Sequence, residues 1–148
     1  MSGEEEDWRP QEMPALIIGR IARLLARRDD ERLREVGLST AQLPVLVALK
    51  NGETHTQKEL ATLAGVEQPS MAQLLARMER DGLIRRQPDP EDRRSSLISL
   101  TAGALDRLRP GRSVLWYGNA EALEGFTADE VQTLTGMLQR IHANVADD

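Results

Sequence analysis

The 148 residues suffice for one domain with its own hydrophobic core, and 40% apolar with 29% charged residues is an ordinary balance for a globular protein. The chain contains no cysteine, which excludes disulfides, thiolate metal sites and a thiol-based redox sensor within it. The net charge of −5 is uneven, because residues 1–12 carry −4, residues 118–148 carry −5 and the middle carries +4. A basic middle favours contact with phosphate, although charged faces that are merely solvated would give the same totals.

Residues 1–13 are polar and acidic and contain Pro10, so we expect a flexible arm. An acidic N-terminus is the opposite of a signal peptide, and no apolar run approaches the roughly 18 residues of a membrane span. We therefore expect a cytoplasmic protein without a membrane partner. Helical spacing of apolar residues then predicts a helix from about Pro14 to Val36, which Gly37 ends.

Three later helix starts are indicated by capping boxes, in which Ser or Thr is followed three residues on by Gln or Glu. These pairs are Ser39 with Gln42, Thr56 with Glu59, and Thr127 with Glu130. The first pair precedes a helix whose expected buried face comprises Leu43, Leu46, Val47 and Leu49. The second opens a short helix that ends at Gly65, and the third opens the last helix of the chain.

A longer helix is predicted over Gln68–Arg80, with a proline in its first turn. Four apolar residues share one face that should be buried: Met71, Leu74, Leu75 and Met78. The opposite arc holds small residues, amides and arginines: Pro69, Ser70, Ala72, Gln73, Ala76, Arg77 and Arg80. Small residues let a helix approach a DNA groove, Gln suits an adenine edge, and Arg suits guanine or phosphate. The alternative is a solvated helix in a helical bundle.

A hairpin should follow, with strands at Leu83–Gln87 and Ser96–Thr101 and a long charged loop between them. Arg93 and Arg94 lie at its far end, beside Asp92. A basic tip of this kind can enter a minor groove, and Asp92 could hold an arginine by a charge-assisted hydrogen bond. An exposed loop with local ion pairs is the simpler interpretation. Beyond the hairpin, a helix from Thr101 should be interrupted or kinked near Pro110-Gly111.

Three stretches together resemble the MarR family of winged helix-turn-helix transcriptional regulators. They are Thr56–Val66 (TQKELATLAGV), Gln68–Arg86 (QPSMAQLLARMERDGLIRR) and Asp89–Gly103 (DPEDRRSSLISLTAG), of which the last is the most specific. The resemblance extends from about residue 14 to 145. It implies a mainly α fold with a small β-wing, six main helices, and a two-fold dimer through the N- and C-terminal helices.

The resemblance also implies which residues contact double-stranded DNA. The recognition helix would be Gln68–Arg80, and its contacts are expected from Gln68, Pro69, Ser70, Ala72, Gln73 and Arg77. The wing would contribute Arg94 to the minor groove, with Arg93 beside it and Asp92 as the supporting partner. Thr56 and Gln57 would meet phosphate at a helix N-terminus.

The two terminal helices carry more apolar surface than one small lobe can cover. The residues concerned are Leu16, Ile17, Ile21, Leu134, Leu138 and Ile141. We expect them to form a homodimer, although they could instead cover only their own core. A two-fold dimer would place its recognition helices roughly 34–36 Å apart and bind a pseudo-palindromic operator. The expected segments are an arm (1–13), a dimerisation helix (14–38), a DNA-binding lobe (39–101), and a connector with a C-terminal dimerisation helix (102–148).

A pocket between the dimer helices and the DNA-binding lobe could bind a small aromatic or anionic effector that releases a repressor from DNA. The residues suggested for its lining are Ile17, Arg20, Ile21, Leu46, Leu115 and Trp116, although plain core, or for Arg20 a surface ion pair, is the simpler interpretation. No cofactor, metal site or catalytic residue is expected, because the two histidines are far apart and no nucleophile or phosphate-loop motif occurs. The remaining alternative to a DNA-binding regulator is a dimeric helical adaptor for another protein, with a degenerate winged lobe.

Overall fold

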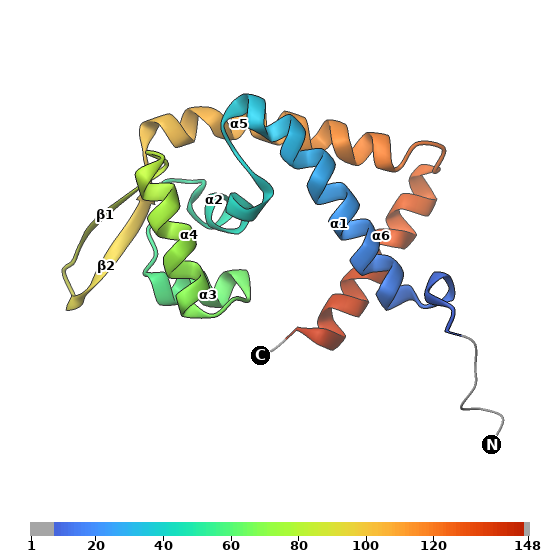
Figure 1. Cartoon of the computed structure of the whole chain (residues 1–148), viewed down its shortest axis with the longest axis horizontal. Coiled ribbons are helices and arrows are strands. Elements are labelled where there is room, and N and C mark those ends of the chain that lie inside the picture. Colours follow the sequence, from blue (N-terminus) through green and yellow to red (C-terminus); the bar gives the residue numbers. More distant parts are fainter. Residues whose placement is uncertain (1–7, 147–148) are drawn as a thin grey trace, which may run out of the picture. The chain divides into compact units, whose positions relative to one another are not determined.

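A computed structural model describes residues 8–146, and these contain six α-helices and one two-stranded antiparallel sheet (Figure 1). In chain order they are α1 (Pro14–Leu33), α2 (Leu43–Leu49), α3 (Gln57–Ala64), α4 (Gln68–Arg80), β1 (Ile84–Asp89), β2 (Asp92–Leu100), α5 (Ala102–Ala122) and α6 (Ala128–Val145). The expected mainly α fold with six main helices and a small β-wing is confirmed. No helix within residues 8–146 is both long enough and apolar enough to cross a membrane.

The chain divides into two units, of which the first ends at Leu115 and the second begins at Trp116, within α5. Most of the expected N-terminal arm, residues 1–7, lies outside the described residues. The remainder of that arm contains a 3₁₀ turn over Pro10–Glu12. Two further 3₁₀ turns, Arg34–Val36 and Thr40–Gln42, extend α1 and precede α2. Because α2 begins only at Leu43, Pro44 falls in its first turn. A proline is tolerated there, since the N–H groups of the first turn have no partner within the helix.

All three predicted capping boxes are present and set the helix starts. Thr56 Oγ1 accepts the Glu59 N–H at 3.2 Å, and Thr127 Oγ1 accepts the Glu130 N–H at 3.1 Å. In the Ser39 box, the Gln42 side chain accepts the Ser39 N–H at 3.0 Å. Each bond satisfies a backbone donor that has no partner within the helix, so these starts follow from local sequence alone.

The core of the first unit forms where α2, α3, α4 and the sheet meet. Its fully buried side chains come from every one of these elements and from the end of α1: Leu33, Val45, Leu46, Leu49, Leu60, Met71, Leu75, Met78, Leu83 and Ile98. One expectation for α2 was wrong, because Val47 is 58% exposed and Val45 takes its place in the core. The preceding 3₁₀ turn sets the rotation of α2, which the apolar pattern alone does not reveal.

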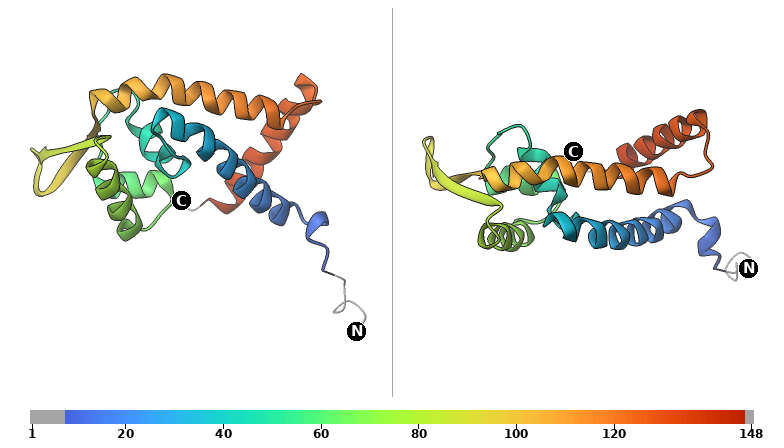
Figure 2. Two further views of the ribbon diagram at one scale, coloured as in Figure 1. Left: turned by 45° about the horizontal axis from the view of Figure 1, so that its top comes forward. Right: turned by 90° about the horizontal axis from the view of Figure 1, so that it is seen from above.

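The hairpin of β1 and β2, called the wing below, has longer strands than the sequence predicted. Pairing runs from Ile84↔Leu100 to Pro88↔Ser96 and then shifts to Asp89↔Asp92. Residues 93–95 are therefore extra on β2, and the turn shrinks to Pro90 and Glu91. The expected long loop was wrong because a bulge absorbs those residues within the strand. Figure 2 shows the wing projecting from the helices as a narrow ribbon.

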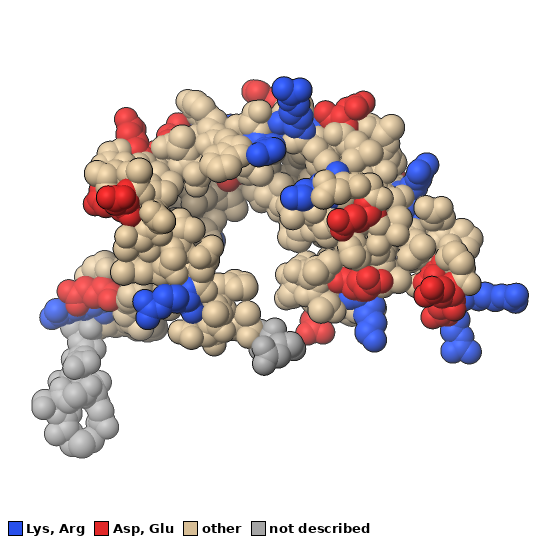
Figure 3. Space-filling model, turned by 180° about the vertical axis from the view of Figure 1, so that it is seen from behind, with Lys and Arg blue, Asp and Glu red and all other residues tan. Residues whose placement is uncertain are grey.

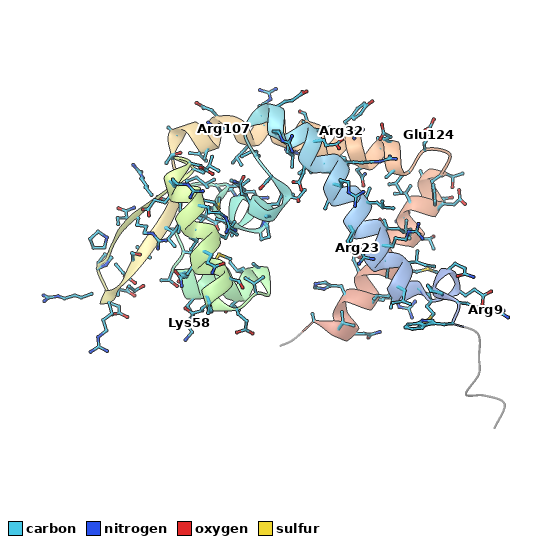
Figure 4. The ribbon with its side chains drawn as sticks, in the orientation of Figure 1. Arg9, Arg23, Arg32, Lys58, Arg107 and Glu124 are labelled. Carbon is cyan, nitrogen blue, oxygen red and sulfur yellow. The ribbon has the colours of Figure 1, made fainter. Side chains whose placement is uncertain are left out.

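Of the interruption or kink predicted near Pro110-Gly111, the interruption was wrong, since α5 runs unbroken from Ala102 to Ala122. Pro110 has no N–H to donate to the carbonyl of Asp106, one turn earlier. Both residues are exposed, so water can solvate that carbonyl. Gly111 is buried, and a Cβ built there would stand 2.7 Å from Leu38 Cδ1. The pair therefore marks a close approach of α5 to the segment that follows α1. Arg107, labelled in Figure 4, also joins these segments by donating to the Gly37 carbonyl oxygen at 3.3 Å.

Candidate nucleic-acid interface

Helix α4 has the two faces that its sequence predicted. Met71, Leu75 and Met78 are fully buried, and Leu74 packs against the core. The other face is solvent-accessible, with Ala72 half-buried and the remaining residues exposed: Gln68, Pro69, Ser70, Gln73, Ala76, Arg77 and Arg80. The core thus fixes α4 so that its amide and arginine side chains point outward.

A tight turn joins α3 to α4. Gly65 has φ +67°, a left-handed conformation that glycine adopts without strain, and its N–H bonds to carbonyls of the last turn of α3. Only Val66 and Glu67 then separate Gly65 from the start of α4. This is the geometry of a helix-turn-helix, with α3 and α4 also in contact along the core.

The wing presents its arginines from the bulge. Arg93 and Arg94 are both exposed, and Asp92 Oδ1 accepts the backbone N–H of Arg94 at 2.9 Å. The sequence predicted that Asp92 would hold an arginine by a charge-assisted hydrogen bond. In the structure the Asp92 carboxylate makes such a bond to the backbone of Arg94, and its role on DNA stays a prediction. The Asp92 side chain thus helps to shape the bulge on which the exposed Arg94 stands.

An open recess of about 550 Å³ lies where α3, α4 and the wing come together. Its lining contains Thr56, Gln57, Lys58, Gln68, Arg86, Asp89, Asp92, Arg94, Ser95 and Ser96. Five of the predicted DNA-contacting residues therefore share one recess: Thr56, Gln57, Gln68, Asp92 and Arg94. Gln73, Arg77 and Arg93, which were also predicted to contact DNA, are exposed but lie outside its lining.

The other half of the recess was not predicted from the sequence: Lys58, Arg86, Asp89, Ser95 and Ser96. A signal existed for Lys58, which follows the Thr56 cap by two residues and so belongs to the exposed first turn of α3. Its side chain points outward from that helix in Figure 4. The others depend on the bulge and on strand register, which local pattern does not determine.

Cations outnumber carboxylates in the recess. Lys58, Arg86 and Arg94 face it together with Asp89 and Asp92. Both carboxylates accept backbone N–H groups of the wing, Asp89 from Glu91 at 3.0 Å and Asp92 from Arg94. The face in Figure 3 likewise shows Lys and Arg side chains projecting at the wing end, with acidic side chains among them. The recess therefore combines fixed backbone geometry with a surplus of positive charge and hydroxyl donors, which suits a phosphate group.

A second, apolar cavity of about 260 Å³ lies within the first unit. Its lining combines residues of α2 and α5 with Leu38: Leu38, Leu43, Leu46, Val47, Lys50, Leu108, Gly111, Arg112 and Leu115. Of the residues suggested for an effector pocket, Leu46 and Leu115 line this cavity. Ile17, Arg20 and Ile21 are on α1 outside its lining, and the exposed Trp116 belongs to the second unit. Residues 8–146 include no cluster of three side chains able to hold a metal ion.

The sequence model of the MarR family matches residues 36–95, the segment that contains α2, α3, α4, β1 and the bulge. Over these residues the chain is similar to the winged helix-turn-helix regulators of the MarR family. This family consists of transcriptional regulators. The match ends within β2, and α1, α5 and α6 lie outside it.

Solved structures extend the MarR-family similarity over most of the chain. A mutant of MarR from E. coli, solved with operator DNA, is 26% identical with a TM-score of 0.78, covering 84% of this chain and 90% of that one. A protein assigned as a transcriptional regulator from Pseudomonas aeruginosa is 26% identical with a TM-score of 0.81, covering 90% and 99%. A chain of Listeria monocytogenes assigned to the MarR family, solved with a 26mer DNA, is 26% identical with a TM-score of 0.81, covering 93% and 91%.

Proposed function

We propose that this MarR-family chain is a sequence-specific double-stranded DNA-binding regulator of transcription. The observation that carries the proposal is the recess, in which the N-terminal turn of α3, the first residue of α4 and Arg94 of the wing lie together. A phosphate in the recess would contact all three elements at once. The two relatives solved with DNA support this proposal.

In this proposal α4 enters the major groove and the wing enters the adjacent minor groove. Gln73 and Arg77 are exposed on α4 and have the donors and acceptors that read adenine and guanine edges. Gln68, Pro69, Ser70 and Ala72 occupy the first turns, where small or amide side chains permit close approach to the groove. Arg94, with Arg93 beside it, would reach the minor groove, whose narrow A·T-rich tracts concentrate negative potential.

We further propose that the regulator acts as a homodimer. Ile17 and Ile21 are exposed on α1, and Leu138 and Ile141 are exposed on α6. Large apolar side chains in such numbers on a single chain favour a partner surface, and a second copy supplies it by symmetry. Residues 14–38 and 102–148 are assigned to dimerisation and connection, and residues 39–101 to the DNA-binding lobe. Two lobes related by a two-fold axis would bind a pseudo-palindromic operator.

Control by a small effector completes the proposal. The apolar cavity between α2 and α5 has Lys50 and Arg112 in its lining, so a small aromatic molecule with an anionic group fits its chemistry. Such a molecule would release a repressor from DNA only to the extent that it binds the released conformation more tightly than the DNA-bound one. The chemistry of the cavity therefore identifies a class of ligand to screen.

Selection of bound duplexes from a random library tests the proposal against the alternative of a protein adaptor. We expect enrichment of a two-fold symmetric sequence. We also expect the affinity to fall steeply with salt, because three cations in each of two recesses give a slope of about −5 in log K against log salt. An adaptor would enrich no sequence.

Gln73→Ala tests the role of α4 within the same selection. Loss of one amide that reads a base should relax preference at one position of each half-site and leave the salt dependence unchanged. A uniform loss of affinity across all sequences would reassign Gln73 to phosphate contact.

A further inference from the structure

One row of residue pairs crosses the base of the wing. Ile98 of β2 pairs with Arg86 of β1 on one side and with His55 on the other. The His55 N–H donates to the Ile98 carbonyl at 3.2 Å, and the Ile98 N–H donates to the His55 carbonyl at 2.8 Å. Because Ile98 is fully buried, this row is anchored in the core.

The two outer residues of this row each bond to a glutamate of the helix-turn-helix. His55 Nδ1 lies 3.0 Å from Glu59 Oε2 on α3, and Arg86 Nε donates to Glu79 Oε1 on α4 at 3.4 Å. The His55 and Arg86 side chains are only 22% and 29% exposed, so each is partly sheltered while its glutamate is near half exposed. We call these contacts the His55–Glu59 strut and the Arg86–Glu79 strut.

We propose that the two struts fix the angle of the wing relative to α3 and α4, and thereby determine how strongly the regulator selects its minor-groove sequence. The inference rests on the proposed function, because it assigns positioning residues to the same DNA interface. The struts attach at opposite sides of one row, so together they oppose tilting of the wing toward either helix. Neither Glu59 nor Glu79 would itself touch DNA.

The length of the wing makes a small tilt important. Arg94 is four residues from Ile98, which corresponds to about 13 Å of extended chain. A tilt of about 10° at the row would move Arg94 by about 2 Å, more than a specific polar contact tolerates. The struts contribute little to global stability, since exposed ion pairs are weak, and their effect is expected at the wing tip instead.

The charge of the two glutamates and their role in the struts predict different effects on DNA binding, so the two can be told apart. Glu59 and Glu79 are negative charges on the DNA-binding lobe, so removing either should strengthen binding to any sequence. Loss of a strut should weaken selection instead, whatever happens to total affinity. The two effects therefore separate when affinity is compared between duplexes that differ only where the wing binds.

Two substitutions of Glu79 provide a matched pair. Glu79→Ala removes both charge and acceptor, whereas Glu79→Gln removes the same charge but keeps an oxygen that can accept from Arg86. Glu35→Ala removes an equal charge from an exposed site on the same unit and serves as the control. His55→Ala tests the other strut while leaving its backbone pairing to Ile98 possible.

The experiment has one readout with DNA and one without it. We expect Glu79→Ala and His55→Ala to reduce the affinity ratio between A·T-flanked and G·C-flanked operators about two- to fivefold, with Glu79→Gln retaining most of the ratio and Glu35→Ala all of it. In the free protein, amide hydrogen exchange at Ile98, whose N–H bonds to the His55 carbonyl, should be faster in the two strut variants. An unchanged ratio in both variants, or an equal loss in Glu35→Ala, would overturn the inference. If the wild-type protein itself showed no flank preference, the proposed wing contact would fail, and hydrogen exchange alone would decide whether the struts hold the wing.

Discussion

Arg94 is exposed on a bulge that the side chain of Asp92 helps to shape by accepting the Arg94 backbone N–H, and it shares a recess with α3 and α4. Arg94→Ala should weaken specific DNA binding by about 1–3 kcal/mol because one guanidinium contact in the minor groove is lost. Fluorescence anisotropy with the selected operator measures this change. Sedimentation should show that the variant has the same oligomeric state as the wild-type protein.

Arg109→Ala is the matched control for Arg94→Ala. Arg109 is exposed on α5 of the same unit and lies outside the recess lining. Arg109→Ala changes the net charge by the same amount as Arg94→Ala. It should reduce DNA affinity only slightly, because the only interaction lost is a weak long-range attraction to the phosphates. Equal effects of the two substitutions would contradict a specific role for Arg94.

Gly111 is a packing residue rather than a helix breaker. Gly111→Ala should lower the free energy of unfolding by about 1–3 kcal/mol, because its Cβ would stand 2.7 Å from the buried Leu38 side chain. Gly103→Ala on the same helix meets only Thr101 Oγ1 at 3.8 Å and should be neutral or stabilise by up to about 1 kcal/mol. Urea denaturation compares the two, and similar stability of both variants would contradict the close approach of α5.

At the scale of the element, the start of α3 should respond to acid. The hydrogen bond to His55, followed by those from the backbone and hydroxyl of Thr56, lowers the pKa of Glu59 below its usual value. A carboxyl with a depressed pKa stabilises the fold above its unfolded pKa, and that contribution is lost as the pH falls through its folded pKa. The stability difference between the wild-type protein and Glu59→Gln should therefore be present at pH 7 and shrink below about pH 4. A difference that stays constant with pH would contradict this assignment.

Local sequence was sufficient to predict three helix starts and both bounds of α4. The three capping boxes needed only residues three positions apart, and α4 was predicted with its observed bounds, Gln68 to Arg80. The buried face of α4 followed from periodicity because Met71, Leu75 and Met78 repeat at helical spacing. The exposed position of Gln73 and Arg77 then followed from the same geometry.

Features set by tertiary contact were not predictable in this way. The bulge at residues 93–95 depends on strand register, so the wing loop was predicted too long. Pro110 was expected to break a helix that packing and solvent exposure allow to continue. Arg86 joined the recess, and paired with Glu79, only because β1 returns alongside α4. Half of the recess lining was therefore missing from the sequence-based site.

At the scale of the whole molecule, the proposed homodimer depends on apolar faces that a single chain leaves open. Truncation after Gly125 removes α6 and should leave monomers in sedimentation experiments. Ile141→Glu in the full chain should do the same without deleting a helix, because burying an unpaired charge at an interface is costly. Gln139→Glu adds the same charge at an exposed polar position of α6 and should remain dimeric. A dimer in both Ile141→Glu and the truncated chain would refute the interface.

The central claim is that each protomer of a two-fold dimer contacts one half-site of the same DNA duplex through its α4 and its wing. A base-resolution footprint on the selected operator tests it most directly, with dimethyl sulfate probing the major groove and hydroxyl radicals probing the minor groove. We expect two protected major-groove segments about 10–10.5 base pairs apart, each next to a protected minor-groove tract that Arg94→Ala exposes. Protection confined to one groove, or minor-groove protection unchanged by Arg94→Ala, would contradict the account.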